Sequence, residues 1–104
     1  MMNQLVLVGR LTDNIKMEQI DDDKYMGITT LGVPRSFKNE YGEYETDFIT
    51  VYMFGNIASN TNELCKKGDL IGIKGRVEST ENNMRIIAEK VTFLSSARNK
   101  KEEE

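Results

Sequence analysis

Residues 46–55 read TDFITVYMFG, and this stretch decides the fold class. Its aliphatic residues alternate with residues that are mostly aromatic: Ile49, Val51 and Met53 form the first set, and Phe48, Thr50, Tyr52 and Phe54 form the second. Because successive side chains of a strand point to opposite faces, this pattern predicts a strand over residues 46–54 with one aliphatic and one aromatic face. Aliphatic side chains fill the interior of a barrel, so we expect the aromatic face to point outward.

Strand patterns also dominate the rest of the chain. Turn formers separate them: the acidic run at residues 21–23, the loop RSFKNEYGEYE at residues 35–45, and Asn82-Asn83, which tolerates positive φ. Pro34 is expected to end its strand or to lie on an edge, because it has no N–H to donate. The other predicted strands cover residues 4–12, with a continuation over 15–20 after a bend at Asp13-Asn14, and residues 24–34, 70–80 and 85–94.

One short helix is predicted in NIASNTNELCKKG, residues 56–68. Asn56 is the candidate N-cap, and Gly68 suits a left-handed C-cap. Lys66 and Lys67 suit the negative C-terminal end of the helix. A narrow apolar stripe is expected to face the core, formed by Ile57, Ala58, Leu64 and Cys65.

The predicted order is three strands, one helix and two strands. This order matches the OB fold, an all-β, five-stranded barrel with a short helix between strands 3 and 4. In that fold the second and third strands form a binding face for oligonucleotides or oligosaccharides. A chain of 104 residues suits one domain, which we place at residues 1–96, followed by a short charged tail at 97–104.

Charge and cysteine content restrict the function further. The net charge is −3, whereas proteins that bind nucleic acid usually show a basic surface. The acidic residues are clustered at 21–23, 40–47 and 102–104, so a local basic track elsewhere remains compatible with the sequence. The single cysteine cannot form an intramolecular disulfide, and the N-terminus does not resemble a secretory signal. We therefore expect a cytoplasmic protein.

The sequence shows no catalytic constellation. It contains no histidine, which excludes His-based triads and His-containing metal sites. Cys65 lies on the apolar stripe and is expected to be a buried structural thiol, although Lys66 and Lys67 follow it. The acidic run lacks the spacing of a calcium loop, and neither glycine motif for phosphate binding occurs. We expect no enzymatic activity, no bound metal and no cofactor.

The aromatic face indicates a binding function instead. In the strand over residues 70–80, Ile71, Ile73 and Val77 share one face, and Lys74 and Arg76 share the other, with Arg85 across the following turn. Aromatic rings beside a short basic track suit unpaired nucleic acid, because every base has a π face and every nucleotide has a phosphate. On pattern alone, an aromatic face buried under a loop or against another subunit is equally compatible. A pair such as Lys74 and Arg76 is by itself more typical of a solvated strand.

Over residues 2–95 the chain resembles the bacterial single-stranded DNA-binding protein family. The resemblance is carried by NQLVLVGRLT at 3–12, RSFKNEYGEYETDFITVYMFG at 35–55, LCKKGDLIGIKGRV at 64–77 and AEKVTFLS at 88–95. It implies an OB fold, sequence-independent binding of single-stranded DNA in replication, recombination and repair, and association with the nucleoid. It also implies a homo-oligomer, a tetramer in preference to a dimer, assembled partly through the first strand. The two-sided apolar start of that strand fits such an interface: Leu5, Val6, Leu7 and Val8.

The resemblance also implies site residues. Phe37 matches a stacking aromatic in the loop after the second strand, and Phe48 and Phe54 match two stacking positions on the third. Positions that commonly contact phosphate in the family are occupied by Arg10, Arg35, Lys38, Lys74 and Arg76. Tyr52 and Arg85 are added to the predicted nucleic-acid-binding residues because of the strand pattern.

The chain departs from the family in three respects. It has no tryptophan, so each stacking platform is smaller. The turn STENN at residues 79–83 replaces a hairpin that is long and basic in the family, and the end KKEEE lacks the family's acidic, phenylalanine-terminated tail. We therefore expect no tail-mediated recruitment of replication proteins. Two alternatives remain open: an OB-fold primosomal adaptor resembling primosomal replication protein N, and an OB module that binds only protein.

Overall fold

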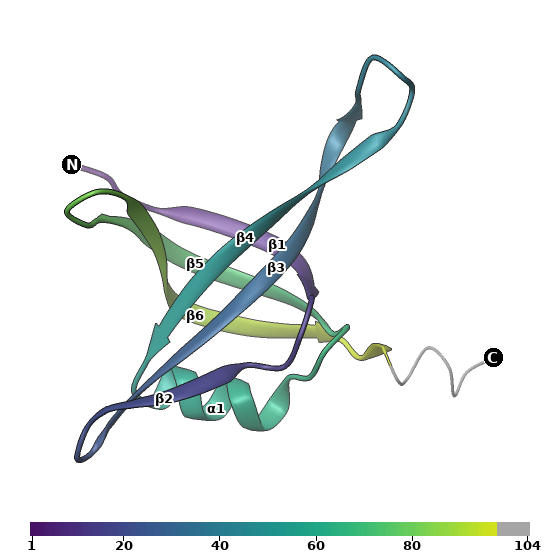
Figure 1. The fold of residues 1–104 in the computed structure, drawn as a ribbon. Coiled ribbons are helices and arrows are strands. Elements are labelled where there is room, and N and C mark those ends of the chain that lie inside the picture. The colour runs from purple at the N-terminus through teal and green to yellow at the C-terminus, as the bar shows by residue number, and fades with distance from the viewer. Residues whose placement is uncertain (98–104) are drawn as a thin grey trace.

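The computed structural model describes residues 1–97, which form a closed barrel with one helix. The elements are β1 (Leu5–Leu11), β2 (Lys16–Asp21), β3 (Lys24–Lys38), β4 (Tyr44–Phe54), α1 (Asn56–Leu64), β5 (Leu70–Ser79) and β6 (Met84–Ser95). The strand order is β1-β5-β6-β4-β3-β2, and an additional pairing of β1 with β3 closes the barrel (Figure 1). The predicted all-β OB fold is confirmed. Strands β1, β3, β4, β5 and β6 form the closed five-stranded barrel, and β2 pairs only with β3. The helix lies between β4 and β5, which are the third and fourth barrel strands along the chain.

Closure of the barrel depends on β1, which pairs with β5 along most of its length and with β3 at its end. Its antiparallel register with β5 runs from Leu5 opposite Gly75 to Arg10 opposite Leu70. The contact with β3 is limited to Arg10 opposite Gly32 and Leu11 opposite Leu31. A Cβ atom on Gly9 would lie 2.5 Å from the carbonyl oxygen of Gly32, so only glycine allows the strands to approach this closely.

The core lies inside the barrel and is mostly aliphatic. Its largest fully buried apolar side chains are Leu11, Leu31, Val51, Met53, Ile71 and Ile73. The helix α1 covers one end of the barrel, with Ala58 and Thr61 buried on its inner side (Figure 1). The predicted alternation in β4 is confirmed, because Val51 and Met53 are buried and Ile49 packs against the core.

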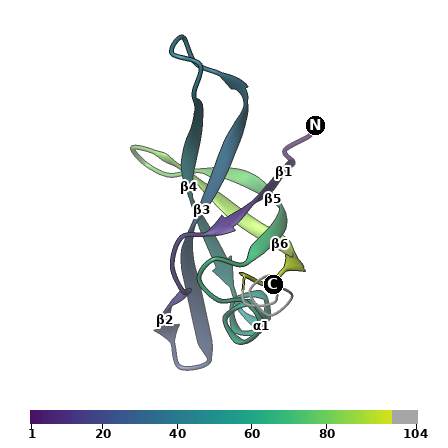
Figure 2. The same cartoon turned by 90° about the vertical axis from the view of Figure 1, so that its right-hand side faces the viewer.

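The strands β3 and β4 continue beyond the barrel as a two-stranded arm, residues 35–47, which projects away from α1 (Figure 2). The loop predicted over residues 35–45 is therefore wrong in its bounds, because only residues 39–43 lie between the two strands. Pairing reaches Lys38 opposite Tyr44, and the turn is closed by the Asn39 N–H, which donates to the Glu43 oxygen at 2.8 Å. Pro34 lies within β3 opposite Thr46, beyond the last β1 contact at Gly32, so its predicted edge position is confirmed.

The predicted helix begins and ends differently. The N-cap is Gly55, with φ 65, and not Asn56, which is the first helical residue; no side chain caps this end. Positive φ favours glycine, so the backbone and not an amide side chain sets this start. Leu64, which was expected on the buried stripe, is 68% exposed.

The helix ends at Leu64 because a turn held by Asp69 follows it. The buried Asp69 carboxylate accepts the Lys66 N–H at 2.8 Å, and the Asp69 N–H donates to the Lys66 oxygen. Gly68 has the predicted positive φ, 90, but it lies in this turn and is not the C-cap. Lys66 and Lys67 both follow the end of the helix. The Lys66 Nζ nevertheless donates to the main-chain carbonyl oxygen of Asn62 in the last helical turn.

Three further differences concern the strands. Residues 15–20 do not extend β1 but form most of β2, which pairs with β3. The turn at Asn82-Asn83 exists, but none of the non-glycine residues in 1–97 has positive φ, and the Thr80 N–H donates to the Asn83 oxygen across the turn. Val77 keeps the predicted parity of β5 but is 37% exposed, because it lies beyond the core cluster.

Candidate nucleic-acid interface

The aromatic face of β4 points outward. Phe48 is 69% exposed, and Tyr52 and Phe54 are half-buried, while Val51 and Met53 are fully buried in the core. Strand alternation produces this arrangement, because successive side chains point to opposite faces and the aliphatic ones point inward. Within a single chain, the alternative of an aromatic face buried under a loop is wrong.

A groove separates this aromatic face from the β5–β6 hairpin. Its volume is about 590 Å³, and we call it the hairpin groove. Met84 is 70% exposed at its edge, and its thioether adds an apolar surface that the sequence analysis missed. The side chains that line the groove include Phe48, Thr50, Tyr52, Val77, Asn83, Met84 and Arg85.

Arg85 places a cation over the inner rings of the aromatic face. Its guanidinium carbon lies 5.3 Å from the centre of the Tyr52 ring and 5.6 Å from that of Phe54. The guanidinium donates to Glu78 Oε1 from Nε at 2.9 Å and from Nη2 at 2.7 Å. The structure therefore brings Arg85, Tyr52 and Phe54 together and adds the Glu78 carboxylate, which was not predicted.

A second groove lies where β1, β3 and β4 meet at the barrel closure. Its volume is about 640 Å³, and we call it the closure groove. Arg10, Pro34 and Phe48 line it, together with Gly9 and Gly32. The Arg10 Nη1 donates to the carbonyl oxygen of Gly68 at 3.0 Å, which leaves its charge without a carboxylate partner among residues 1–97. Because Phe48 lines both grooves, they form one path across β4.

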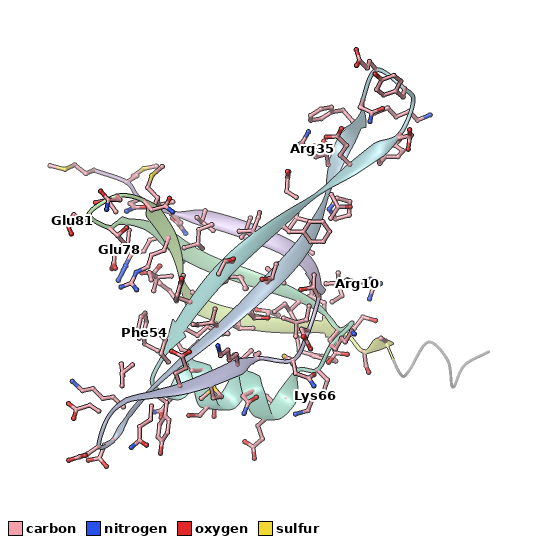
Figure 3. All side chains as sticks on the ribbon, viewed as in Figure 1. Arg10, Arg35, Phe54, Lys66, Glu78 and Glu81 are labelled. Carbon is pink, nitrogen blue, oxygen red and sulfur yellow. The ribbon has the colours of Figure 1, made fainter. Side chains whose placement is uncertain are left out.

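Arg35, at the base of the arm, is held by two carboxylates (Figure 3). Its Nη1 lies 2.6 Å from Glu45 Oε2, and its Nη2 lies 2.9 Å from Asp47 Oδ1. The hydrogen bond from Arg35 holds the pKa of Asp47 below its usual value. Two negative charges beside one positive charge make this predicted phosphate contact a poor one in the free protein.

The arm carries three exposed aromatic side chains. Phe37 is 62% exposed and lies on β3, not in a loop, while Tyr41 and Tyr44 are 77% and 60% exposed. The Nζ of Lys38 lies 5.8 Å from the centre of the Tyr44 ring. Tyr41 and Tyr44 were not among the predicted binding residues. Their spacing from Phe37 within a polar segment would have indicated further exposed aromatic side chains.

The two predicted basic residues of β5, Lys74 and Arg76, line neither groove. Lys74 stands opposite Val6 of β1 and Lys90 of β6, which places it on the outer face of these three strands. Arg76 is paired with Glu78 at 3.4 Å and with Glu89 at 3.8 Å. Arg76 therefore shares one face with Arg85, as predicted, but the carboxylates of Glu78 and Glu89 interrupt the basic track.

The predicted interface strand has two different faces. Val6 and Val8 are 68% and 48% exposed on the outside of β1. Leu7 packs against the core, and Leu5 is half-buried. Of the four predicted interface residues, the two valines are thus the ones whose side chains are open to a partner.

The remaining candidates for chemistry are structural. Cys65 is buried, as predicted, and burial followed by the Asp69 charge raises the pKa of its thiol. Residues 1–97 contain no cluster of three or more potential metal ligands. Over the same residues, no helix is both long enough and apolar enough to span a membrane.

The described chain matches the model of the single-strand binding protein family over residues 2–94. It belongs to this family. Its sequence is 40% identical to "Single-stranded DNA-binding protein 3" of Listeria innocua, over 95% of this chain and 68% of that protein. It is 34% identical to "Single-stranded DNA-binding protein 2" of Staphylococcus aureus, over 98% of this chain and 80% of that protein.

A solved structure supports the fold. The wild-type single-stranded DNA binding protein from Thermus aquaticus superposes with a TM-score of 0.74, at 23% identity, over 93% of this chain. The superposed part is 52% of the Thermus aquaticus chain, so this chain spans about half of the length of that protein.

Proposed function

We propose that this chain binds single-stranded DNA without sequence preference and protects it in replication, recombination and repair. The observation that carries the proposal is the outward aromatic face of β4, which joins two grooves through Phe48. Family membership and relatives named single-stranded DNA-binding proteins support the same ligand.

Binding combines stacking with phosphate contacts. Unpaired bases stack on Phe48 and on the Tyr52 and Phe54 end of the face, and Phe37 extends the path along the arm. Arg10 supplies a positive charge in the closure groove, and Arg85 supplies one in the hairpin groove. Duplex DNA is a poor ligand, because its base faces are already stacked and the nine-residue α1 packs its inner side against the barrel.

The proposal includes assembly into a homo-oligomer, a tetramer in preference to a dimer, through the outer face of β1. Exposed Val6 and Val8 support it, since adjacent exposed apolar side chains on a strand suit contact with a second chain. The protein acts by binding alone, without catalysis. We place it with the nucleoid in the cytoplasm, where reducing conditions suit its single buried thiol.

Fluorescence anisotropy tests the proposal directly. Labelled oligo(dT), a mixed-sequence single strand and the corresponding duplex are titrated with the protein at several salt concentrations. We expect similar affinity for the two single strands, a loss of affinity with salt, and much weaker binding to the duplex. Equal affinity for single strand and duplex would contradict the proposal, and absence of oligo(dT) binding would favour a protein-binding OB module.

A further inference from the structure

Glu78 bridges two arginines beside the hairpin groove. Its Oε1 accepts two hydrogen bonds from Arg85, at 2.9 and 2.7 Å, and its Oε2 lies 3.4 Å from Arg76 Nη2. Glu78 stands directly opposite Arg85 in the β5–β6 register, and Arg76 is two residues before it on the same strand. One carboxylate therefore engages both guanidinium groups.

These three side chains are accessible to a ligand. The exposed fractions are 33% for Arg85, 36% for Glu78 and 39% for Arg76. Ion pairs at this exposure are weak, so a second anion can replace the carboxylate at little cost. Arg85 is also the residue whose guanidinium covers the Tyr52 and Phe54 rings, so its partner determines where the cation lies over the aromatic face.

Building on the proposed function, we infer that Glu78 competes with DNA phosphate for Arg85 and Arg76. In the free protein the carboxylate holds both guanidinium groups and neutralises part of their charge. When single-stranded DNA enters the hairpin groove, a phosphate replaces Glu78 on Arg85, and the displaced carboxylate stays close enough to repel it. Glu78 is thus a positioning residue that keeps binding weaker and less salt-dependent than the number of arginines predicts.

The test is Glu78→Gln, which removes the charge but keeps the shape and the carbonyl acceptor. Freeing one or two arginines for phosphate should steepen the salt slope by about 0.7 to 1.4, at roughly 0.7 per phosphate on a single strand. At 50 mM salt we expect oligo(dT) to bind roughly five- to tenfold more tightly than to the native protein. At 200 mM this advantage should fall by roughly three- to sevenfold, as the slope change requires. Glu78→Ser, a smaller neutral replacement, should give the same slope.

Glu81→Gln is the matched control. Glu81 lies at the tip of the same hairpin and has no ion pair within residues 1–97 (Figure 3). The substitution changes the net charge equally, so a general charge effect would move both variants alike. We expect Glu81→Gln to leave the salt slope unchanged and the affinity within about twofold.

A double-mutant cycle assigns the effect to the pair. In an Arg85→Gln background, Glu78→Gln should lose at least half of its gain in affinity, because the main competitor for the carboxylate is gone. Equal slopes for Glu78→Gln and the native protein, or equal gains from Glu78→Gln and Glu81→Gln, would overturn the exchange while leaving DNA binding intact. Absence of oligo(dT) binding in every variant would overturn the proposed function itself and the exchange with it.

Discussion

Phe48 has an unusual position for a large apolar residue. Its ring is 69% exposed although Val51 and Met53 of the same strand are fully buried, and it lines both grooves. Leaving a phenylalanine in water gives up the free energy that its burial would provide. A ligand with flat apolar faces recovers that free energy on binding, which is why we assign the central stacking position to Phe48.

Replacing Phe48 by alanine should weaken binding of single-stranded DNA by about 1 to 3 kcal/mol, the usual range for one lost stacking partner. The thermal midpoint should stay unchanged, because so little of the ring is buried. Leu64→Ala is the control, since Leu64 is 68% exposed on α1 and lines neither groove. Phe54→Ala should reduce affinity and also stability, because Phe54 is half-buried beneath Arg85. Anisotropy and calorimetry on the same samples separate the two effects, and an unfolded Phe48→Ala protein would contradict this assignment.

Single residues were predictable where periodicity determines their surroundings. The period of two in residues 46–54 placed the aromatic rings outside and the aliphatic side chains inside, and both placements are confirmed. The ion pairs of Arg35 with Glu45, Arg76 with Glu89 and Arg85 with Glu78 were not predictable, because these partners are set by cross-strand register. Register depends on turn lengths and bulges that a hydrophobic pattern does not encode.

At the scale of elements, the arm is the main feature that the sequence did not reveal. Its residues are polar and contain turn formers, so they were expected to form a loop. Backbone pairing between β3 and β4 nevertheless continues to Lys38 and Tyr44. Arg35 stabilises this extension through Asp47 and Glu45, because its guanidinium reaches across from β3 to β4.

The pKa of Asp47 reports directly on this cross-strand contact. Arg35→Gln should raise that pKa toward the ordinary value of about 3.9, since the hydrogen bond from Arg35 is the main cause of its lowering. In the native protein the pair's contribution is complete above the unfolded-state pKa and is lost as pH falls through the lower folded-state pKa. Carboxyl carbon chemical shifts measured by NMR between about pH 2 and 6 follow this titration. An unchanged pKa in Arg35→Gln would show that the contact is not formed in solution.

The β5–β6 hairpin is the second informative element. It turns within a few residues after Ser79 and carries Glu78 and Glu81, so it offers acidic side chains where a longer basic arm would offer phosphate contacts. We expect a shallow salt dependence and a site size toward the low end of about 4 to 16 nucleotides per OB fold. Titration with oligo(dT) of graded length measures both. Inserting basic residues at the turn should increase both quantities, whereas insertion of the same number of serines should not; no difference between the insertions would show that the arm is irrelevant.

The helix shows why element ends are hard to predict. The apolar stripe located α1 correctly, but its ends depend on the positive φ of Gly55 and on the carboxylate of Asp69, which binds a backbone N–H three residues earlier. Such local hydrogen bonds compete with helical ones, and side-chain pattern alone does not rank them.

At the scale of the whole molecule, exposed apolar side chains gather on the outer face of β1, β5 and β6. Val6 and Val8 are exposed on β1, and Leu94 of β6 is 48% exposed. A Cβ on Gly72 of β5 would lie 3.9 Å from Val8 and 3.7 Å from Leu94, so these residues form one apolar patch. Apolar side chains that are continuous over three strands suit contact with a second copy.

Glutamate in place of both valines should therefore lower the oligomeric mass. Burying carboxylates at such an interface is unfavourable, and each symmetric contact would bring like charges together. Light scattering at micromolar protein concentration, with and without oligo(dT), measures the mass. Leu64→Glu on α1 serves as the control and should leave the mass unchanged. A native protein that is already monomeric under these conditions would contradict the proposed assembly.

The closure of the barrel through β1 also has a consequence for synthesis of the chain. Leu5 pairs with Gly75, so β1 leaves the ribosome well before its main partner, which is complete only after some 70 further residues have been added. The β3–β4 hairpin is local and can form earlier, whereas β1 must wait with its apolar residues uncovered. Barrels dominated by such distant pairings fold in about milliseconds to seconds, after translation of the last strand and not during it. The nascent N-terminal segment is therefore the part of this chain that we expect molecular chaperones to bind first.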